Sequence, residues 1–251
     1  MKRKLWWRWA LLALCVGVLV ISVGKVVGVY VRGSREQGAF DRLAEIAARQ
    51  NDTADASSPR EVLPRFTELL AQNSDLQGWI TIPDTGIDYP VMQSDADAEF
   101  YLHRGFDRAD TVSGTPFLAD GCSPDSDCVI VYAHNMRNGT MFGTLDRYLR
   151  AEYLAQHPTV WFDSLYQERE YEVFAAVQTR VYGSGAPGFH YYDCAGTLSK
   201  TERAQLVDWL LEHSAWDSGI VPGAEDQILI LSTCSYHTRD GRFLIAAVRT
   251  P

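Results

Sequence analysis

The chain has 251 residues, of which 46% are hydrophobic and 22% charged, so it can form a full core and is not a disordered protein. Its net charge of −9 is unevenly distributed: residues 1–35 hold seven basic residues and no acidic one, which leaves −16 for residues 36–251. Nucleic-acid binding needs a basic surface, so this acidic body argues against it.

Residues 5–31 form an apolar run interrupted by only two charged residues. Roughly 20 apolar residues suffice to cross the hydrocarbon core of a bilayer. Basic residues precede the run and three tryptophans lie near its start, which is the pattern of a transmembrane signal anchor. Residues 1–4 would then be cytoplasmic and the body extracellular. A cleaved signal peptide is the alternative, but no clear small-x-small cleavage site follows the run.

Residues 32–59 are expected to form a helical stalk and linker. A short helix is expected over 39–50, and the polar segment 51–59 is rich in turn-forming residues. The folded domain then covers residues 60–251. It opens with apolar residues at helical spacing over 61–73, which predict an N-terminal helix.

Short β-rich apolar runs dominate the folded domain. Because Gly, Asp and Asn turns separate them, they favour a mainly β fold, a closed barrel of about eight strands, over an alternating α/β fold. A short helix is expected over 141–150, and a longer one follows a capping box at Ser199. The expected strands are 79–83, 87–92, 115–119, 128–134, 159–162, 171–181, 227–234 and 243–249.

Two of these strands end on reactive side chains. Strand 128–134 ends on His134 and strand 227–234 ends on Cys234, with Arg242 eight residues further along the chain. A thiolate attacks a carbonyl carbon, and a histidine can exchange the protons that this reaction requires. An arginine can hold the substrate carbonyl or the developing oxyanion. The three residues are therefore a candidate site for covalent catalysis.

Each of these residues also has a structural explanation when taken alone. A cysteine in an apolar strand is most often part of the core, and His134 or Arg242 alone is most simply a partner for nearby backbone or carboxylate groups. His237, three residues after Cys234, is an alternative general acid, although it is expected to point into the loop after the strand. Only the conjunction of the three residues favours catalysis.

The turn between Cys234 and Arg242 decides whether the two side chains can share a substrate. Asp240-Gly241 is typical of a tight two-residue hairpin, which would place Arg239 opposite Arg242. Cys234 would then lie about 17 Å from Arg242 along the strands, at roughly 3.4 Å per residue. A wide loop over 235–241 would instead place them side by side.

Two cysteines, Cys122 and Cys128, flank a turn in the exported part. We expect them to be either free thiols or joined in a disulfide, because an exported protein can form disulfides but need not. A metal site that includes His134 is less favoured, since the spacing lacks the short pairs of structural zinc sites. No metal and no cofactor is expected, and no Gly-rich phosphate loop supports nucleotide chemistry.

At Leu231-Ser-Thr-Cys234 and Gly241-Arg242 the sequence resembles the sortases, the membrane-anchored cysteine transpeptidases of Gram-positive bacteria. The resemblance covers about residues 76–249 and is greatest to class B, whose insertion the helix over 199–214 also resembles. The matching stretches are Gly78-Trp-Ile-Thr-Ile-Pro83, Ile87-Asp-Tyr-Pro-Val-Met92, Phe100-Tyr-Leu-His103 and His134-Asn-Met-Arg-Asn-Gly-Thr-Met-Phe142.

The resemblance implies roles for five residues. Cys234 would be the nucleophile, His134 the general acid and base, and Arg242 the group that holds the substrate carbonyl. Tyr132 and Ser232 would line the substrate groove. Two features do not match the family: the segment 121–127, with Cys122 inside it and Cys128 directly after it, and Cys194 in the variable loop.

The implied reaction cleaves the C-terminal sorting signal of a surface protein or pilin, of the Asn-Pro-x-Thr type, after its threonine. A thioacyl-enzyme then passes the protein to an amine of a peptidoglycan precursor or of a pilin. One alternative is a hydrolytic cysteine peptidase on the same scaffold. Another is a membrane-anchored binding protein whose cysteine is a buried structural residue.

Overall fold

The computed structural model describes residues 2–51, 61–183 and 185–251. The chain divides into two compact units, Met1–Ala39 and Phe40–Pro251. Helix α1 (Lys2–Asn51) is continuous, so the prediction of a separate short helix over 39–50 is wrong. The predicted linker, except for its first residue, lies outside the described residues.

The apolar part of α1 meets the criteria for a membrane-spanning helix. By length and composition the candidate span is Trp9–Ala48, with a mean hydropathy of 2.5 in its most apolar window. A signal sequence near an N-terminus meets the same criteria. The assignment of residues 5–31 as an uncleaved anchor therefore stays a prediction.

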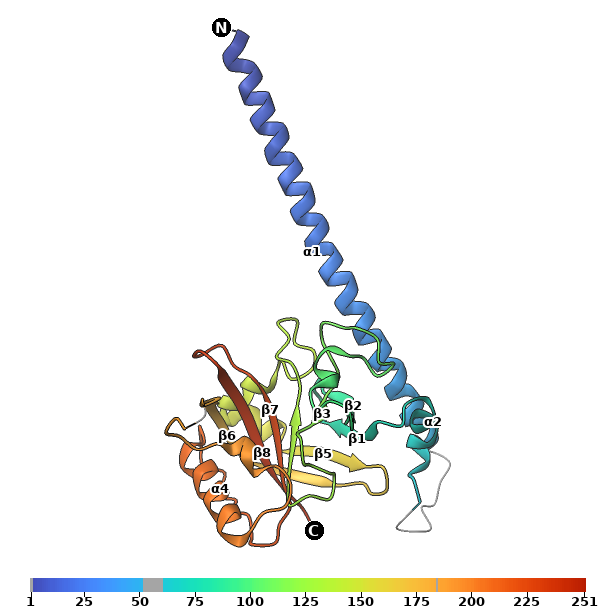
Figure 1. The fold of residues 1–251 in the computed structure, drawn as a ribbon, viewed down its shortest axis with the longest axis vertical. Coiled ribbons are helices and arrows are strands. Elements are labelled where there is room, and N and C mark those ends of the chain that lie inside the picture. Colours follow the sequence, from blue (N-terminus) through green and yellow to red (C-terminus); the bar gives the residue numbers. More distant parts are fainter. Residues whose placement is uncertain (1, 52–60, 184) are drawn as a thin grey trace. The chain divides into compact units, whose positions relative to one another are not determined.

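A closed eight-stranded β-barrel forms the second unit (Figure 1). The strands pair in the order β1-β2-β3-β4-β7-β8-β6-β5, and β5 pairs with β1 to close the barrel. The predicted mainly β fold is confirmed. The strands are β1 (Leu76–Thr81), β2 (Asp88–Met92), β3 (Phe117–Leu118), β4 (Cys128–Tyr132), β5 (Thr159–Ser164), β6 (Glu170–Arg180), β7 (Ile228–Cys234) and β8 (Gly241–Arg249).

Helices surround the barrel, and most are a single turn or two. The longest of them, α4, packs against β6 and matches the helix predicted before the cysteine strand. Ser199 Oγ accepts a hydrogen bond from Glu202 N, and Glu202 Oε2 accepts one from Ser199 N, so the predicted capping box is confirmed. The helices are α2 (Pro64–Gln72), η1 (Phe100–His103), η2 (Leu145–Leu149), α3 (Ala151–Gln156), η3 (Tyr191–Cys194) and α4 (Lys200–His213).

The segment after β4 differs from its prediction. The helix expected over 141–150 is a 3-10 turn, η2, that begins only at Leu145. Met141 has a φ of +54° and forms an isolated bridge with Asn135, which excludes it from a right-handed helix. The strand itself ends at Tyr132 rather than at His134, because the chain turns there and the His134 carbonyl accepts a hydrogen bond from Phe142 N.

Candidate active site

Two parallel strands bring His134 and Cys234 to the same edge of the barrel. β4 and β7 pair in register from Cys128 and Ile228 to Tyr132 and Ser232. The register continues beyond β4, because Thr233 Oγ1 donates to the Ala133 carbonyl at 2.7 Å and Asn135 Nδ2 donates to the Cys234 carbonyl at 2.8 Å. His134 and Cys234 each lie two residues after the last paired residues of the two strands, Tyr132 and Ser232. They are therefore held at neighbouring positions, although a hundred residues separate them in sequence.

A wide loop places Cys234 beside Arg242. In the antiparallel pairing of β7 and β8, Cys234 lies directly opposite Arg242, so the tight hairpin at Asp240-Gly241 is excluded. Directly opposed residues extend their side chains from the same face of a sheet. Asp240 has a φ of +55°, and Gly241 approaches the chain so closely that a Cβ would lie 2.3 Å from the Ser235 carbonyl oxygen. The alternative in which the two residues are side by side is confirmed.

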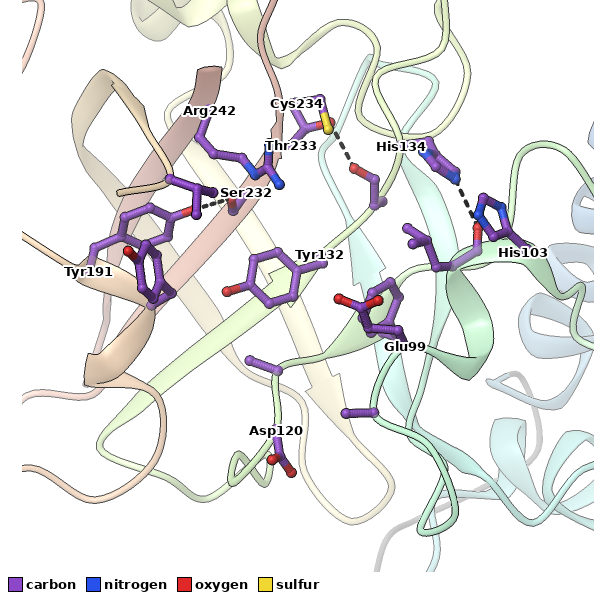
Figure 2. A pocket seen from close by; sticks show the side chains of 17 residues that line it. Glu99, His103, Asp120, Tyr132, His134, Tyr191, Ser232, Thr233, Cys234 and Arg242 are labelled. Atoms are coloured by element: carbon purple, nitrogen blue, oxygen red, sulfur yellow. Dashed lines mark hydrogen bonds between the residues drawn. The ribbon is translucent and has the colours of Figure 1, made fainter. Parts of the chain in front are cut away.

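A cavity of about 560 Å³ contains all five predicted site residues (Figure 2). Cys234 is exposed, and in Figure 2 Arg242 lies on one side of it and His134 on the other. Acidic side chains at the rim are Glu99 and Asp120. The residues that line it are Ala98, Glu99, Leu102, His103, Phe117, Ala119, Asp120, Tyr132, Ala133, His134, Val181, Tyr191, Tyr192, Ser232, Thr233, Cys234 and Arg242.

The ring of His134 is oriented by a backbone carbonyl. Its Nε2 lies 2.8 Å from the Leu102 carbonyl oxygen, which can only accept, so Nε2 carries the proton. In the neutral ring Nδ1 is then the basic atom. Burial lowers the pKa of His134, the bond to Leu102 opposes this shift, and the nearby His103 lowers the pKa further. The neutral imidazole is thus favoured at neutral pH.

The effect of His103 on the pKa of His134 can be tested, because the centroids of the two rings lie 5.4 Å apart. A positive charge on His103 disfavours a second one on His134. In the His103→Gln variant we expect the titration midpoint of His134 to move upward, measured by NMR of the imidazole in a Cys234→Ala background. The matched control is His213→Gln, which changes a histidine on α4 outside the cavity. A midpoint that stays unchanged or falls would contradict this electrostatic coupling.

Ser232 and Tyr132 lie deeper in the cavity on the two parallel strands. Ser232 is fully buried, and its Oγ lies 2.7 Å from the hydroxyl of Tyr191. This bond connects η3, in the loop between β6 and α4, to the strand that carries Cys234. Burial raises the pKa of the Tyr132 and Tyr191 hydroxyls, so both stay neutral.

The other cysteines of the barrel differ sharply from Cys234. Cys122, Cys128 and Cys194 are buried free thiols, so the disulfide alternative for the first two is wrong. The Cys122 Sγ donates to the Cys128 carbonyl at 3.4 Å. Burial raises the pKa of all three thiols, that of Cys194 to about 11. Among the described cysteines of the barrel, only Cys234 is exposed.

The described residues contain no group of three or more His, Cys, Asp or Glu placed to hold a metal ion.

Several residues of the cavity were missed in the sequence. His103 and Tyr191 lie in short 3-10 helices, which have no periodic signal. The motif at Phe100–His103 indicates the position of His103 but not its contact with His134. The alternative general acid, His237, is placed in the loop as expected, where its Nδ1 lies 2.8 Å from Ser235 Oγ. His237 is not among the described residues that line the cavity.

Comparisons with known proteins agree with this architecture. The sequence model of the Sortase domain matches residues 80–250. Sortase B of Listeria monocytogenes is 28% identical over 221 residues, which are 87% of this chain and 86% of that protein. The crystal structure of sortase B from Bacillus anthracis has a TM-score of 0.73 at 26% identity and covers 88% of this chain and 99% of that one.

A third similar protein is the Staphylococcus aureus sortase B in its complex with substrate. It shares the fold, with a TM-score of 0.73 at 24% identity, and covers 88% of this chain and 98% of that one. The sequence region that the Sortase model matches, residues 80–250, includes the strands that carry Cys234 and Arg242. The chain therefore belongs to the sortase family and, within it, is a class B sortase, a cysteine transpeptidase.

Proposed function

We propose that this sortase cleaves a C-terminal sorting signal of the Asn-Pro-x-Thr type after its threonine and joins the protein to an amine. Cys234 is the nucleophile, His134 the general acid and base, and Arg242 the group that holds the substrate carbonyl. The observation that supports this most strongly is the register of β7 and β8, which sets Cys234 directly opposite Arg242 at the cavity that His134 also lines. Tyr132 and Ser232 would line the part of the groove that receives the signal.

The first half of the reaction forms a thioacyl-enzyme. Nδ1 of His134 takes the proton of the Cys234 thiol, because its Nε2 is already engaged with the Leu102 carbonyl. The sulfur attacks the threonine carbonyl carbon, and Arg242 donates to the oxygen as negative charge develops on it. The carbon–nitrogen bond then breaks, and His134 returns its proton to the departing amine.

The second half transfers the acyl group. The nitrogen of an acceptor amine bonds to the thioacyl carbon and gives one proton to Nδ1 of His134, while the carbon–sulfur bond breaks and its electron pair returns to Cys234 as thiolate. Sortase B structures with a substrate and with a triglycine peptide support a sorting signal and an amine as the two partners of the class. The acceptor proposed here is an amine of a peptidoglycan precursor or of a pilin. The protein partners are surface proteins or pilins that carry the signal.

An N-terminal anchor would keep this reaction at the cell envelope, where sortases act. We propose residues 1–4 as the cytoplasmic end, 5–31 as the membrane span, 32–59 as stalk and linker, and 60–251 as the extracellular catalytic domain. The support is the apolar length of α1 together with the basic residues that precede its apolar run.

A peptide panel tests the reaction. The full chain in detergent is incubated with fluorogenic Asn-Pro-x-Thr and scrambled peptides, with and without an added amine, and products are resolved by mass spectrometry. We expect cleavage after threonine in the authentic peptide only, and an amide product when amine is present. Cleavage that yields only the free acid at every amine concentration would favour the hydrolytic peptidase. No cleavage of any peptide would favour the binding protein.

A further inference from the structure

The segment from His134 to Phe142, which we call the histidine loop, folds back on itself directly after β4. Asn135 and Met141 form an isolated antiparallel bridge, and the His134 carbonyl accepts a hydrogen bond from Phe142 N at 3.0 Å. The backbone that carries the His134 ring is therefore held by the returning end of the loop. The proposed mechanism uses this ring but none of the residues that hold the loop.

Asn135 joins the histidine loop to the strand that carries Cys234. Its Nδ2 donates to the Cys234 carbonyl at 2.8 Å. On the N-terminal side of His134, Ala133 N donates to the Ser232 carbonyl at 3.3 Å. His134 is thus flanked by two residues that are each bonded to β7. Proton transfer between an imidazole and a thiol requires hydrogen-bond reach, so these two bonds help to set the distance on which the reaction depends.

Met141, the bridge partner of Asn135, has a backbone conformation that requires support. Its φ of +54° lies in the left-handed region, which a residue with a large side chain rarely adopts and which persists only where the surrounding structure holds it. Met141 N donates to the hydroxyl of Tyr89 at 3.1 Å, and both residues are buried. Because a buried N–H without a partner is costly, the Tyr89 hydroxyl stabilises this conformation directly.

The C-terminal part of α1 packs against Tyr89. The ring of Phe40 meets that of Tyr89 edge to face, with centroids 5.3 Å apart and an interplanar angle of 84°. Phe40, Leu43 and Ala47 are buried, and their spacing places them on one face of the helix. They belong to the same compact unit as the barrel. Edge-to-face contact is a favourable geometry for two aromatic rings, so the helix helps to hold the Tyr89 hydroxyl where Met141 N can reach it.

We propose that Tyr89 and Asn135 are positioning residues for the sortase reaction. The Tyr89 hydroxyl holds Met141 in its left-handed conformation, which closes the histidine loop. Asn135 holds the start of the closed loop against Cys234, beside the ring of His134. The C-terminal part of α1, which packs on Tyr89, contributes to the order of the site as well. This inference rests on the proposed function, because it requires proton exchange between His134 and Cys234.

The test compares kcat with KM in the full chain. Initial rates of cleavage of a fluorogenic Asn-Pro-x-Thr peptide are measured over a range of concentrations, at a temperature at which thermal unfolding shows every variant to be folded. Tyr89→Phe removes one oxygen and keeps the ring, and Asn135→Ala removes one hydrogen-bond donor. In each variant we expect kcat to fall about tenfold while KM stays unchanged, because the cavity keeps its lining and only the geometry of proton transfer is disturbed. A wild-type kcat in either variant would overturn the inference, as would a loss confined to KM.

A matched control separates positioning from a general loss of stability. Tyr171→Phe also removes a buried hydroxyl, but Tyr171 lies on β6 and its hydroxyl donates to Gln227 Oε1, at 2.7 Å, instead of to the histidine loop. This variant should leave both kinetic constants unchanged. A fall in kcat equal to that of Tyr89→Phe would overturn the inference. Absence of peptide cleavage by the wild type would instead overturn the proposed function.

A double-mutant cycle tests the contribution of α1. Phe40→Ala should lower kcat by a smaller factor than Tyr89→Phe does. The Phe40→Ala, Tyr89→Phe double variant should be no slower than the slower single variant, because residues that act through one shared contact do not have additive effects. Two losses that multiply in the double variant would overturn the action of α1 through Tyr89.

Discussion

Replacement of Cys234 by alanine is expected to abolish cleavage of the sorting peptide, with kcat/KM lower by at least about 10³-fold. The reason is that no other described thiol of the barrel can replace it, since Cys122, Cys128 and Cys194 are buried and their pKa values are raised. Loss of a nucleophile removes the covalent route entirely and leaves only the contribution of binding and polarisation. The measurement is steady-state cleavage of a fluorogenic Asn-Pro-x-Thr peptide.

The same variant should fold as the parent does. Cys234 is exposed at the end of β7, so removal of its sulfur leaves no buried cavity, and such surface changes alter stability by about 0.5 kcal/mol or less. Thermal unfolding of both proteins provides the control. A folded Cys234→Ala protein that still cleaves within tenfold of the wild-type rate would contradict the assignment of the nucleophile.

Replacement of Arg242 by alanine is expected to lower kcat/KM about 10²- to 10³-fold, the usual loss when one donor to a developing oxyanion is removed. Lysine should recover little of this loss, because a single ammonium does not reproduce the planar fork of donors. Among the described residues the Arg242 guanidinium donates one hydrogen bond, from Nη1 to the Gly241 carbonyl at 3.1 Å, so the rest of its donor fork is available to a substrate. Initial rates over a range of peptide concentrations separate kcat from KM.

Arg239→Ala is the matched control for Arg242. Arg239 lies three residues earlier, in the loop before β8, and is exposed, and its Nε lies 3.6 Å from Oδ2 of the adjacent Asp240. Its loss should leave both kinetic constants unchanged. If Arg239→Ala and Arg242→Ala reduced activity equally, the effect would come from the net charge of the loop, and the proposed contact between Arg242 and the carbonyl would be wrong.

The barrel and its reactive residues could be predicted because their signals are local. Short runs rich in apolar residues define most strands, and the capping box at Ser199 sets the start of α4. The position of Cys234 at the end of β7 is read from the same runs, and so is that of His134, which lies two residues past the end of β4. The parallel pairing of β4 and β7, which brings those ends together, follows from contacts a hundred residues apart and has no local pattern.

The loop after Cys234 shows where local rules fail. Asp240-Gly241 favours a tight turn, but here Asp240 takes the left-handed φ within a longer loop, and Gly241 N donates to the Thr238 carbonyl at 3.2 Å. The pairing of Ser235 N with the Gly241 carbonyl, at 2.9 Å, continues the ladder one step past Cys234. Tertiary pairing with β6 on the other side of β8 also holds this register, from Arg180 opposite Gly241 onward.

Covalent catalysis by Cys234 is tested most directly by intact-mass spectrometry of the full chain, quenched during a single turnover with an Asn-Pro-x-Thr peptide. We expect a protein heavier by the acyl fragment that ends in threonine, with the added mass mapped to Cys234 and lost when an amine is added. The Cys234→Ala variant should show no such species. Cleavage without any adduct, or an adduct on another residue, would contradict covalent catalysis by Cys234.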